Sequence, residues 1–513
     1  MARNDDTSEK RARLSRRAFL KAGGAGVAVA ALGALPFATA RALRQDEVEA
    51  WDRETDVLII GYGGAGAAAA VVARDEGAEV LILEKREVAG GATIVSGGAT
   101  YSGATPVQEE HDISDSVDTL HEHHMAAGGG LNDSDLVRVL AERSGDDIAW
   151  LRSLGADFTD APVVGGSEAP YRTEEIPRVH WFSFGDYDGG IAFFRVMADA
   201  AEERGADVEY ETRVERLVAD DEGAVIGVRA TRGDDTLYVR ARKAVVIATG
   251  GFTRDDDMLA TYSRAGHAGE PQTPPGLTGD GHKMAFALGA DAWTMWKIAG
   301  TPGLIPPGAD RAVAGPLVGI TVNERGDRFM DETGYYDLRN QALANQPGSR
   351  GFVVFDDRIR ADEAPIVPQF SDSLDEEVDE GRVHRADSLE ALAEAIEVPA
   401  DRLVATVERW NENVADDDDP DHERTQALTP IEEGPFYALE IVPTMYDTGG
   451  GIRIDSEARV VNVFGDVIPR LYAAGQVAGG VVGETYVGGT SLSMVLTFGR
   501  VAGRNAANED ARS

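Results

Sequence analysis

The sequence predicts an α/β fold in which a domain built on a parallel sheet is interrupted by an α+β domain, after an N-terminal signal segment. An apolar run at 57–60 leads directly into a glycine-rich turn and a stretch of small residues. A similar strand-and-glycine pattern returns at 471–476. Between them, over 295–447, the glycine motifs stop and acidic helical stretches with proline-rich joints take over. Because 513 residues exceed one ordinary core, we expect two domains.

The glycine-rich turn is the most specific motif of the chain. Gly61 permits a tight turn, Gly63 lets the backbone approach a pyrophosphate, and Gly66 lets the following helix pack closely on the strand. The N-terminus of that helix then faces the phosphates. About twenty residues further on, Glu84 ends a second expected strand, 79–83, where an acidic side chain accepts hydrogen bonds from ribose hydroxyls. This order of elements predicts a Rossmann-like dinucleotide site.

Glycine clusters also occur outside this turn, at 90–93, 96–98, 248–251, 278–281 and 471–476. A nicotinamide dinucleotide needs no such set. A flavin that stays buried requires several close backbone approaches, which glycine permits. With these motifs the chain resembles the FAD-dependent fumarate reductase and succinate dehydrogenase flavoprotein family, including its 3-ketosteroid dehydrogenase and tricarballylate dehydrogenase-like branches, over roughly 56–506.

The resemblance implies non-covalent FAD, held by a Rossmann-like FAD-binding domain in two parts, 51–294 and 448–513. The intervening 295–447 corresponds to the capping, or substrate, domain of the family. Gly91 stands where succinate dehydrogenases place their flavin-linked histidine, so we expect no covalent link. The residues expected to bind FAD are Gly61, Gly63, Gly64, Ala65, Gly66, Glu84, Lys85, Gly91, Ala92, Thr93, Ser96, Gly97, Gly98, Val214, Thr249, Gly250, Asp280, Gln476, Ser491 and Leu492. Ser491 and Leu492 open a C-terminal helix whose amides, by the same resemblance, face the flavin pyrimidine ring.

The positions that carry charge in fumarate reductases are uncharged here. That family places its proton-donating arginine eight residues after the arginine of an Arg-Phe-x-x-Glu motif, and counting from Arg328 this position is Tyr336. Tyr486 occupies the region of a second family arginine. Tyr446 and Thr301 replace two histidines that hold substrate carboxylates. A dicarboxylate would meet too few cations to offset its desolvation.

The replacements resemble the 3-ketosteroid dehydrogenases instead. There a tyrosine at the position of Tyr336 serves as base, and one close to Tyr486 polarises the substrate ketone. Tricarballylate dehydrogenase-like sequences share the second tyrosine, and the steroid branch usually has one more residue in that turn. We therefore expect an exported FAD-dependent oxidoreductase of a CH–CH bond next to a carbonyl, with Tyr336, Tyr486 and Tyr446 as catalytic candidates. The alternative for all three is an aromatic core with satisfied hydroxyls.

Two other functions remain open from the sequence. The protein could reduce or dehydrogenate an unsaturated carboxylate, with Arg339, one helical turn after Tyr336, as the replacement cation. It could also be a flavin-binding electron carrier without an organic substrate. The chain has no cysteine, which excludes disulfides, cysteine-ligated iron–sulfur clusters and thioether-bound haem, so the electron donor or acceptor is expected to be a separate molecule.

The formal charge of −40 excludes a nucleic-acid partner, since phosphate binding rests on clustered lysine and arginine. Lysine occurs only at positions 10, 21, 85, 243, 283 and 297. Such a surface is typical of a protein that stays hydrated at high salt; the alternative is an ordinary acidic protein. The oligomeric state is left open by the sequence.

The charge leads to a prediction about salt. Carboxylates repel one another over distances that salt screens, because the Debye length falls from about 10 Å at 0.1 M to about 3 Å at 1 M. We expect the melting temperature of the protein to rise steeply between these two NaCl concentrations in a thermal unfolding series. A flat or falling profile would indicate an ordinary acidic protein.

The N-terminus, 1–45, is interpreted as a signal and tail. Residues 15–21 read Ser-Arg-Arg-Ala-Phe-Leu-Lys, which matches a twin-arginine export signal, and the apolar run 22–35 is too short to span a bilayer. Small residues at 38–40 and at 40–42 form alternative cleavage sites. A basic amphipathic helix is the competing interpretation, but the run is apolar on all faces. We expect export through the twin-arginine translocon.

Two polar clusters are expected to lie at the surface without a chemical role. His121, His123 and His124 fall in an expected surface helix, where no further ligand accompanies them at a fixed spacing, so no metal is expected. The acidic run 416–419 is expected to be a surface loop.

Overall fold

The structure of the chain is a computed structural model, which describes residues 42–158, 160–164, 176–263, 269–306, 309–316 and 318–512. The described residues belong to one compact unit, Arg41–Ser513. The expected export signal and its cleavage sites up to residue 41 lie outside the described residues. Among the described residues, no helix combines the length and the apolar character that crossing a bilayer requires.

The larger sheet carries the glycine-rich turn. Its strands run in the order β1-β7-β8-β9-β2-β3-β6, with β22 also paired to β9 and β21 to β22. Strands β22, β9, β2, β3 and β6 pair in parallel, whereas β7, β8 and β9 form an antiparallel meander. The bounds are β1 (Leu43–Arg44), β2 (Arg53–Ile60), β3 (Val80–Leu83), β6 (Asp207–Glu209), β7 (Thr212–Ala219), β8 (Val225–Arg232), β9 (Asp235–Ile247), β21 (Arg459–Val461) and β22 (Val467–Ala473). The sheet thus takes in Leu43 and Arg44, which the sequence analysis assigned to the signal and tail.

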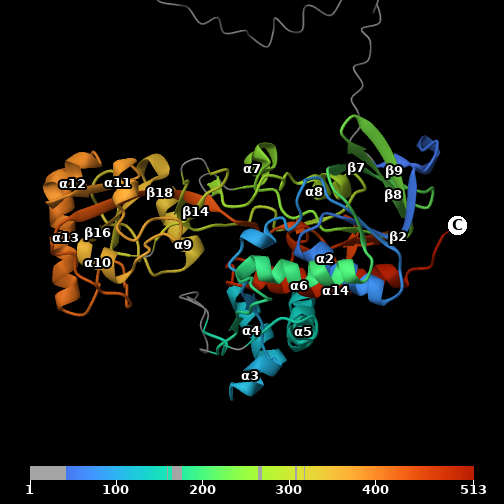
Figure 1. The fold of residues 1–513 in the computed structure, drawn as a ribbon, viewed down its shortest axis with the longest axis horizontal. Coiled ribbons are helices and arrows are strands. Elements are labelled where there is room, and N and C mark those ends of the chain that lie inside the picture. The colour runs from blue at the N-terminus through green and yellow to red at the C-terminus, as the bar shows by residue number, and fades with distance from the viewer. Residues whose placement is uncertain are drawn as a thin grey trace, which may run out of the picture. The chain divides into compact units, whose positions relative to one another are not determined.

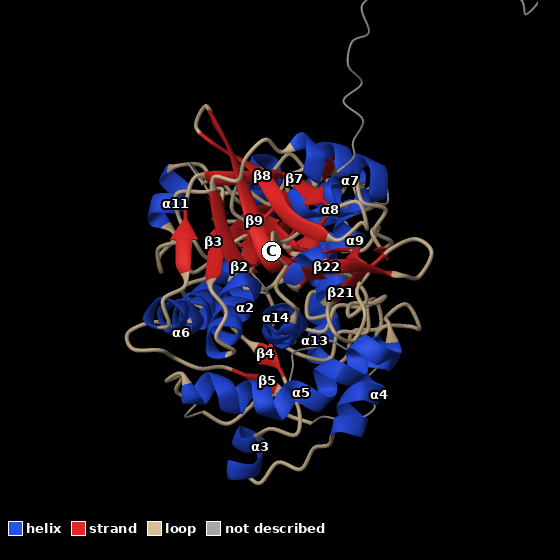
Figure 2. Cartoon of the chain, turned by 90° about the vertical axis from the view of Figure 1, so that its right-hand side faces the viewer, coloured by secondary structure: helices blue, strands red, loops and turns tan. Residues whose placement is uncertain are grey.

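Helices α2 (Gly64–Asp75), α6 (Gly189–Glu203) and α14 (Thr490–Asn508) lie along one face of this sheet (Figure 2). The contact between α2 and α14 depends on small residues. A Cβ atom on Gly499 would lie 2.8 Å from the Ala65 carbonyl oxygen, and one on Gly503 would lie 2.3 Å from that of Ala69. Strand β2 is buried on both faces, which explains its unbroken apolar run. The first and last helices of the nucleotide domain are therefore packed backbone to backbone.

A second sheet and a second hydrophobic core lie within 270–445 of the chain, around β18 (Figure 1). The strands are β10 (Glu270–Pro271), β13 (Pro302–Leu304), β14 (Val313–Ala314), β15 (Ile320–Val322), β16 (Gly351–Asp356), β17 (Val383–Ala386) and β18 (Phe436–Met445). The helices of this region are α9 (Tyr336–Ala344), α10 (Asp357–Asp362), α11 (Asp375–Asp379), α12 (Leu389–Ala395) and α13 (Ala400–Ala415). Most of this sheet is antiparallel.

The remaining strands and α-helices lie outside these two sheets. They are β4 (Thr100–Tyr101), β5 (Val179–His180), β11 (Ala292–Trp293), β12 (Ile298–Ala299), β19 (Asp447–Thr448), β20 (Gly451–Ile452), α3 (Pro106–Glu110), α4 (Val117–Ala127), α5 (Ser134–Ser153), α7 (Asp256–Tyr262) and α8 (Asp280–Phe286). Strand β12 pairs with β19, so the segment that leads into β13 lies beside the segment that follows β18.

The histidine cluster is not the surface feature that the sequence analysis expected. His121 is partly exposed, but His123 and His124 are buried on the inner face of α4. The Tyr101 hydroxyl lies 3.3 Å from His123 Nδ1, and burial lowers the pKa of His124 to about 3. The error has a physical reason: α4 packs on β4, so two of the three histidines are core residues, and burial keeps His124 neutral. Within the described residues, no group of His, Cys, Asp or Glu side chains is arranged to hold a metal ion.

The acidic run is also only partly a surface loop. Residues 416–418 are exposed, but Asp419 is buried and accepts a hydrogen bond of 2.8 Å from Arg328 Nη1. Arg328 and Arg424 lie over the Trp410 ring, with guanidinium carbons 4.5 and 4.9 Å from its centroid. The expectation failed because a charge run gives no sign of a distant buried partner.

Candidate active site

A cavity of about 590 Å³ opens at the carboxyl ends of the parallel strands, where nucleotides bind in open α/β sheets. Every residue expected to bind FAD lines it except Gly66. The lining residues from that set are Gly61, Gly63, Gly64, Ala65, Glu84, Lys85, Gly91, Ala92, Thr93, Ser96, Gly97, Gly98, Val214, Thr249, Gly250, Asp280, Gln476, Ser491 and Leu492. Their role as cofactor ligands remains a prediction, and their common location supports it.

The glycine turn has the close contacts that its spacing predicts. Gly61 has a φ of +99°, and a Cβ atom there would lie 2.5 Å from the Ala248 carbonyl oxygen. A Cβ atom on Gly66 would lie 2.1 Å from the Gly61 carbonyl oxygen, so this glycine shapes the turn without lining the cavity. The Gly64 amide donates a hydrogen bond of 3.1 Å to Thr93 Oγ1, which joins the turn to the next glycine cluster.

Glu84 is held in place by backbone amides at the end of β3. Its carboxylate accepts hydrogen bonds of 2.9 Å from the amides of Tyr62 and Arg86. A carboxylate has about four acceptor sites, so capacity remains for ribose hydroxyls. Both interactions leave Glu84 at the cavity wall in a fixed orientation.

Lys85 and Asp280 form an ion pair beside this carboxylate. Lys85 Nζ lies 2.8 Å from Asp280 Oδ2 and 2.7 Å from Thr278 Oγ1, and Arg213 lies 3.0 Å from the other Asp280 oxygen. Burial acts to raise the pKa of Asp280, but the two cations outweigh it and the pKa is lowered. These contacts link the strand end at β3 to the start of α8.

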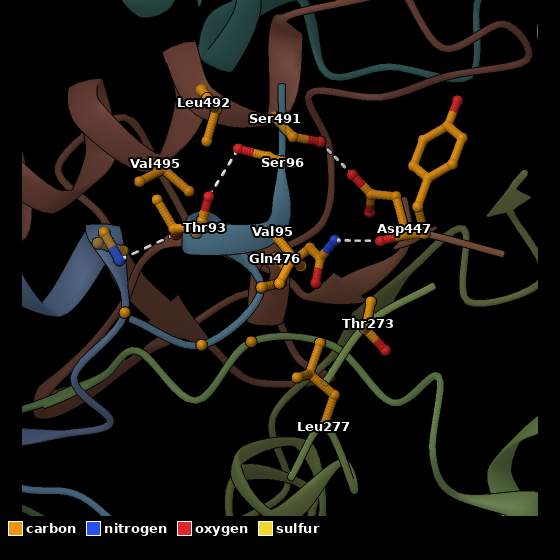
Figure 3. A pocket seen from close by; sticks show the side chains of 18 of the residues that line it. Thr93, Val95, Ser96, Thr273, Leu277, Asp447, Gln476, Ser491, Leu492 and Val495 are labelled. Carbon is orange, nitrogen blue, oxygen red and sulfur yellow. Dashed lines mark hydrogen bonds between the residues drawn. The ribbon is translucent and has the colours of Figure 1, made fainter. Parts of the chain in front are cut away.

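Asp447 is a buried acid that the sequence analysis did not single out. In Figure 3 its carboxylate faces Ser491, whose hydroxyl donates a hydrogen bond to it, and Gln476 Nε2 donates to the Tyr446 carbonyl oxygen at 3.2 Å. Burial raises the pKa of Asp447 to about 6. An acid placed two residues before the glycines at 449–450 was the available signal. It joins the predicted flavin-facing helix to the tyrosine cluster.

The three candidate tyrosines come together in the wall of the same cavity, along with Thr301. The rings of Tyr446 and Tyr486 are 5.5 Å apart in an edge-to-face arrangement, and Tyr336 opens helix α9 beside them. Burial raises the pKa of Tyr446 well above its ordinary value. The positions come from separate parts of the chain, and the cavity exposes all of them to one space.

A buried ion pair behind the tyrosines joins their segments. Lys297 Nζ donates to the Asp337 carboxylate and, at 2.8 Å, to the Glu484 carbonyl oxygen. The Gly300 amide donates to Asp337 Oδ1 at 3.2 Å. Burial raises the pKa of Asp337, although Lys297 acts against this. Sequence reasoning missed this pair, because neither residue stands in a recognisable motif.

The cavity wall contains few cations. Among the described residues that line it, Lys85 and Arg86 are the only lysine or arginine side chains, and both follow Glu84 at the nucleotide end. Arg339 does not line the cavity. It lies behind Tyr336, with its guanidinium carbon 5.5 Å from the centre of that ring. The part of the wall formed by the tyrosines therefore contains no described lysine or arginine.

The site fits a flavin dinucleotide by its backbone cradle and by its unused polar groups. Within the described residues, the buried Thr249 Oγ1 at the cavity wall has no hydrogen-bond partner, so it is available to a ligand. The N-terminus of α2 supplies the positive end of a helix for phosphates. Bound there, FAD would supply hydride transfer at its N5 atom.

Comparisons with known proteins bear on the family and the cofactor of this chain. The model of the "FAD binding domain" family matches residues 56–492. The fumarate reductase (cytochrome) of Shewanella frigidimarina is 34% identical over 455 residues, covering 88% of this chain and 77% of that protein. The 4-oxocyclohexanecarboxylate 2-dehydrogenase of Sinomonas cyclohexanicum is 30% identical over 556 residues, covering 89% and 93%.

A solved structure is similar over most of both chains. The 3-ketosteroid Δ4-(5α)-dehydrogenase of Rhodococcus jostii, solved with 4-androstene-3,17-dione, is 29% identical with a TM-score of 0.73, and the match covers 91% of this chain and 100% of that one. The fold, the cofactor and the kind of bond acted on are common to these relatives. The chain therefore belongs to the FAD-dependent fumarate reductase and succinate dehydrogenase flavoprotein family, and it is an FAD-dependent oxidoreductase that acts on CH–CH groups.

Proposed function

We propose that the protein oxidises or reduces a carbon–carbon bond next to the carbonyl of a neutral substrate, such as a cyclic ketone or enone. The observation that carries this proposal is the composition of the cavity wall, where Tyr336, Tyr446 and Tyr486 stand in a part that no described lysine or arginine lines. Hydroxyl groups suit a ketone oxygen, whereas two carboxylates would lose their hydration without gaining cations. The similarity to a ketosteroid dehydrogenase supports a neutral cyclic ketone. The oxocyclohexanecarboxylate dehydrogenase supports the cyclic ketone, although its named substrate also carries a carboxylate.

Each of the three tyrosines has its own role in this proposal. Tyr336 exchanges a proton with the carbon next to the carbonyl. The Tyr486 hydroxyl donates a hydrogen bond to the carbonyl oxygen, and backbone amides near Gly489 add to this where enolate charge develops. Tyr446 packs edge to face on Tyr486 and holds its ring. The hydride moves between the neighbouring carbon and the cofactor.

The experiment is an anaerobic screen against the photoreduced holoenzyme, followed by the return of flavin absorbance. Enones of the cyclohexenone and steroid types are expected to reoxidise the flavin, and fumarate, acrylate and urocanate are expected not to. Reoxidation by the acids alone would overturn the proposal. Reoxidation by none of these compounds, but by a protein or quinone acceptor, would indicate an electron carrier.

An unsaturated carboxylate is the second candidate substrate. The 34% identity to a fumarate reductase favours it. The cation proposed to anchor such a substrate, Arg339, lies outside the cavity wall, behind Tyr336. A carboxylate would reach it only after that ring moves, so the ketone is the better match to the geometry.

We also propose that the protein is exported folded, with FAD bound, by the twin-arginine translocon, and that a separate molecule exchanges its electrons. The support is the motif at 15–21, together with the absence of cysteine in the chain. Changing Arg16 and Arg17 together to Lys is expected to leave flavin-loaded protein in the cytoplasm, as cell fractionation would show. Unchanged export of this variant would contradict the assignment.

A further inference from the structure

Arg339 is a buried cation placed behind the tyrosine cluster. Its side chain is 5% exposed, on the turn of α9 that follows Tyr336. The guanidinium carbon lies 5.5 Å from the centre of the Tyr336 ring. A guanidinium keeps its proton in proteins, so a full positive charge is held next to this ring.

Nearby carboxylates are used by other groups. Within the described residues, Arg339 Nε has no hydrogen-bond partner. Glu332 accepts hydrogen bonds from Arg328 at 2.7 Å and from Arg424 at 2.9 Å, and Asp331 accepts from Thr333. The cation thus lies over the Tyr336 ring, and no described ion pair joins it to a carboxylate.

The electrostatics of Arg339 indicate which groups could balance it. Burial lowers the pKa of Arg339, and the strongest opposing influences come from Tyr336 and then Tyr446. This attraction is mutual: a phenolate that favours the charged guanidinium is itself favoured by it. A buried charge without a counter-charge is costly, so an anion forming on an adjacent phenol is stabilised.

We propose that Arg339 stabilises the phenolate form of Tyr336 and makes this tyrosine a base that works near neutral pH. The inference rests on the proposed function, in which Tyr336 exchanges a proton with the substrate. In the step concerned, the C–H bond next to the carbonyl breaks and the proton bonds to the phenolate oxygen. The electron pair remains on the substrate as an enolate, which Tyr486 stabilises.

The other charged groups around the ring do not duplicate this effect. On α9 itself, Asp337 is paired with Lys297. From the end of β18 and the segment after it come Tyr446 and Asp447, and from the loop before α14 comes Tyr486. These groups are acids, which disfavour a second negative charge. Lys297 is neutralised by Asp337, but no described ion pair joins Arg339 to a carboxylate.

A phenolate at Tyr336 bears on the direction of the reaction. An unperturbed tyrosine, with a pKa of about 10, is a serviceable acid and a poor base at neutrality. A reductase that only donates a proton needs no cation at this place. A buried arginine behind the ring is suited to proton removal, and so to dehydrogenation.

The test compares Arg339→Met and Arg339→Lys with the native holoenzyme. Tyrosine labelled with ¹³C at Cζ reports ionisation by NMR, and the signal lost in Tyr336→Phe identifies Tyr336. We expect the ionisation midpoint of Tyr336 to rise by about 1 to 3 pH units in Arg339→Met, the shift expected of one nearby opposite charge. In Arg339→Lys this midpoint should rise less. An unchanged midpoint in Arg339→Met would overturn the inference.

Arg350 offers a matched control. Its guanidinium carbon lies 5.9 Å from the Phe352 ring and it does not line the cavity, so Arg350→Met should leave the Tyr336 titration unchanged. If Arg339→Met does not retain FAD, Arg339→Gln keeps a hydrogen-bonding head and takes its place. This titration needs no substrate. A shifted midpoint in a protein that turns over no ketone would therefore leave the electrostatic inference standing and reject the proposed function instead.

A second readout separates the inference from a substrate-anchoring role. With a ketone identified in the screen, the pH profile of solvent deuterium exchange at the α carbon should move to higher pH in Arg339→Met, and the rate should recover at high pH. An anchoring role would instead raise KM for carboxylate substrates with no shift of the profile. That result would overturn the inference.

Discussion

Tyr336→Phe is expected to lower turnover by about 10² to 10⁴-fold, which corresponds to roughly 3 to 5 kcal/mol of barrier, the usual contribution of a positioned acid or base. The change keeps the ring, so FAD content and the contact with Arg339 should survive. The rate at which the hydrogen on the substrate α carbon exchanges with solvent should fall together with turnover. Steady-state kinetics and deuterium exchange followed by NMR measure both quantities.

Tyr335→Phe is the matched control, because this neighbouring tyrosine is buried and does not line the cavity. It should keep turnover close to that of the native protein. Tyr486→Phe should lower turnover, since one donor to the carbonyl oxygen is lost, with less effect on exchange than Tyr336→Phe. Native rates of turnover and exchange in Tyr336→Phe would show that another group moves the proton.

Breaking the Lys297–Asp337 pair is expected to lower the free energy of unfolding by about 3 to 5 kcal/mol, because either single change leaves the other residue as a buried charge without its counter-charge. The side chains are 4% and 5% exposed. Lys297→Met leaves the Asp337 carboxylate alone, and Asp337→Asn leaves the ammonium alone. Urea unfolding of the holoenzyme measures the loss in the free energy of unfolding.

Two comparisons sharpen this measurement. The double variant Lys297→Met with Asp337→Leu removes both charges and should lose less than the sum of the single changes. The half-exposed pair Arg195–Asp199 on α6 is the control, and Arg195→Ala should cost no more than about 1 kcal/mol. A loss of that small size in both Lys297→Met and Asp337→Asn would show that the buried pair does not hold the tyrosine segments together.

The nucleotide half of the molecule could be predicted from the sequence because its signals are local. Gly61, Gly66 and Glu84 stand at spacings set by one turn, one helix and one strand, and the structure reproduces these contacts. The tyrosines could be found only through the resemblance to a family. Nothing in the local sequence indicates that Tyr336 and Tyr486 share a cavity wall.

The residues that were missed act over long distances in the chain. Lys297 meets Asp337 and the Glu484 carbonyl, and Asp419 meets Arg328, across loops whose geometry the sequence does not contain. His123 and His124 were misplaced for a related reason. A polar residue on a helix is predicted to face water unless the element packed against it is known, and here that element is β4.

The close packing of α14 on α2 bears on how the protein is made. The cavity wall begins with Ile60, close to the start of the described chain, and it includes Ser491, Leu492 and Val495 from the last helix. During synthesis almost the whole polypeptide must therefore be made before α14, the helix that packs beside the glycine-rich turn, is available. The ribosome must release the C-terminal helix before that wall can close around a cofactor. A chain cut short by a few tens of residues would retain every nucleotide motif up to Gln476 and still lack the side of the site that encloses its ligand.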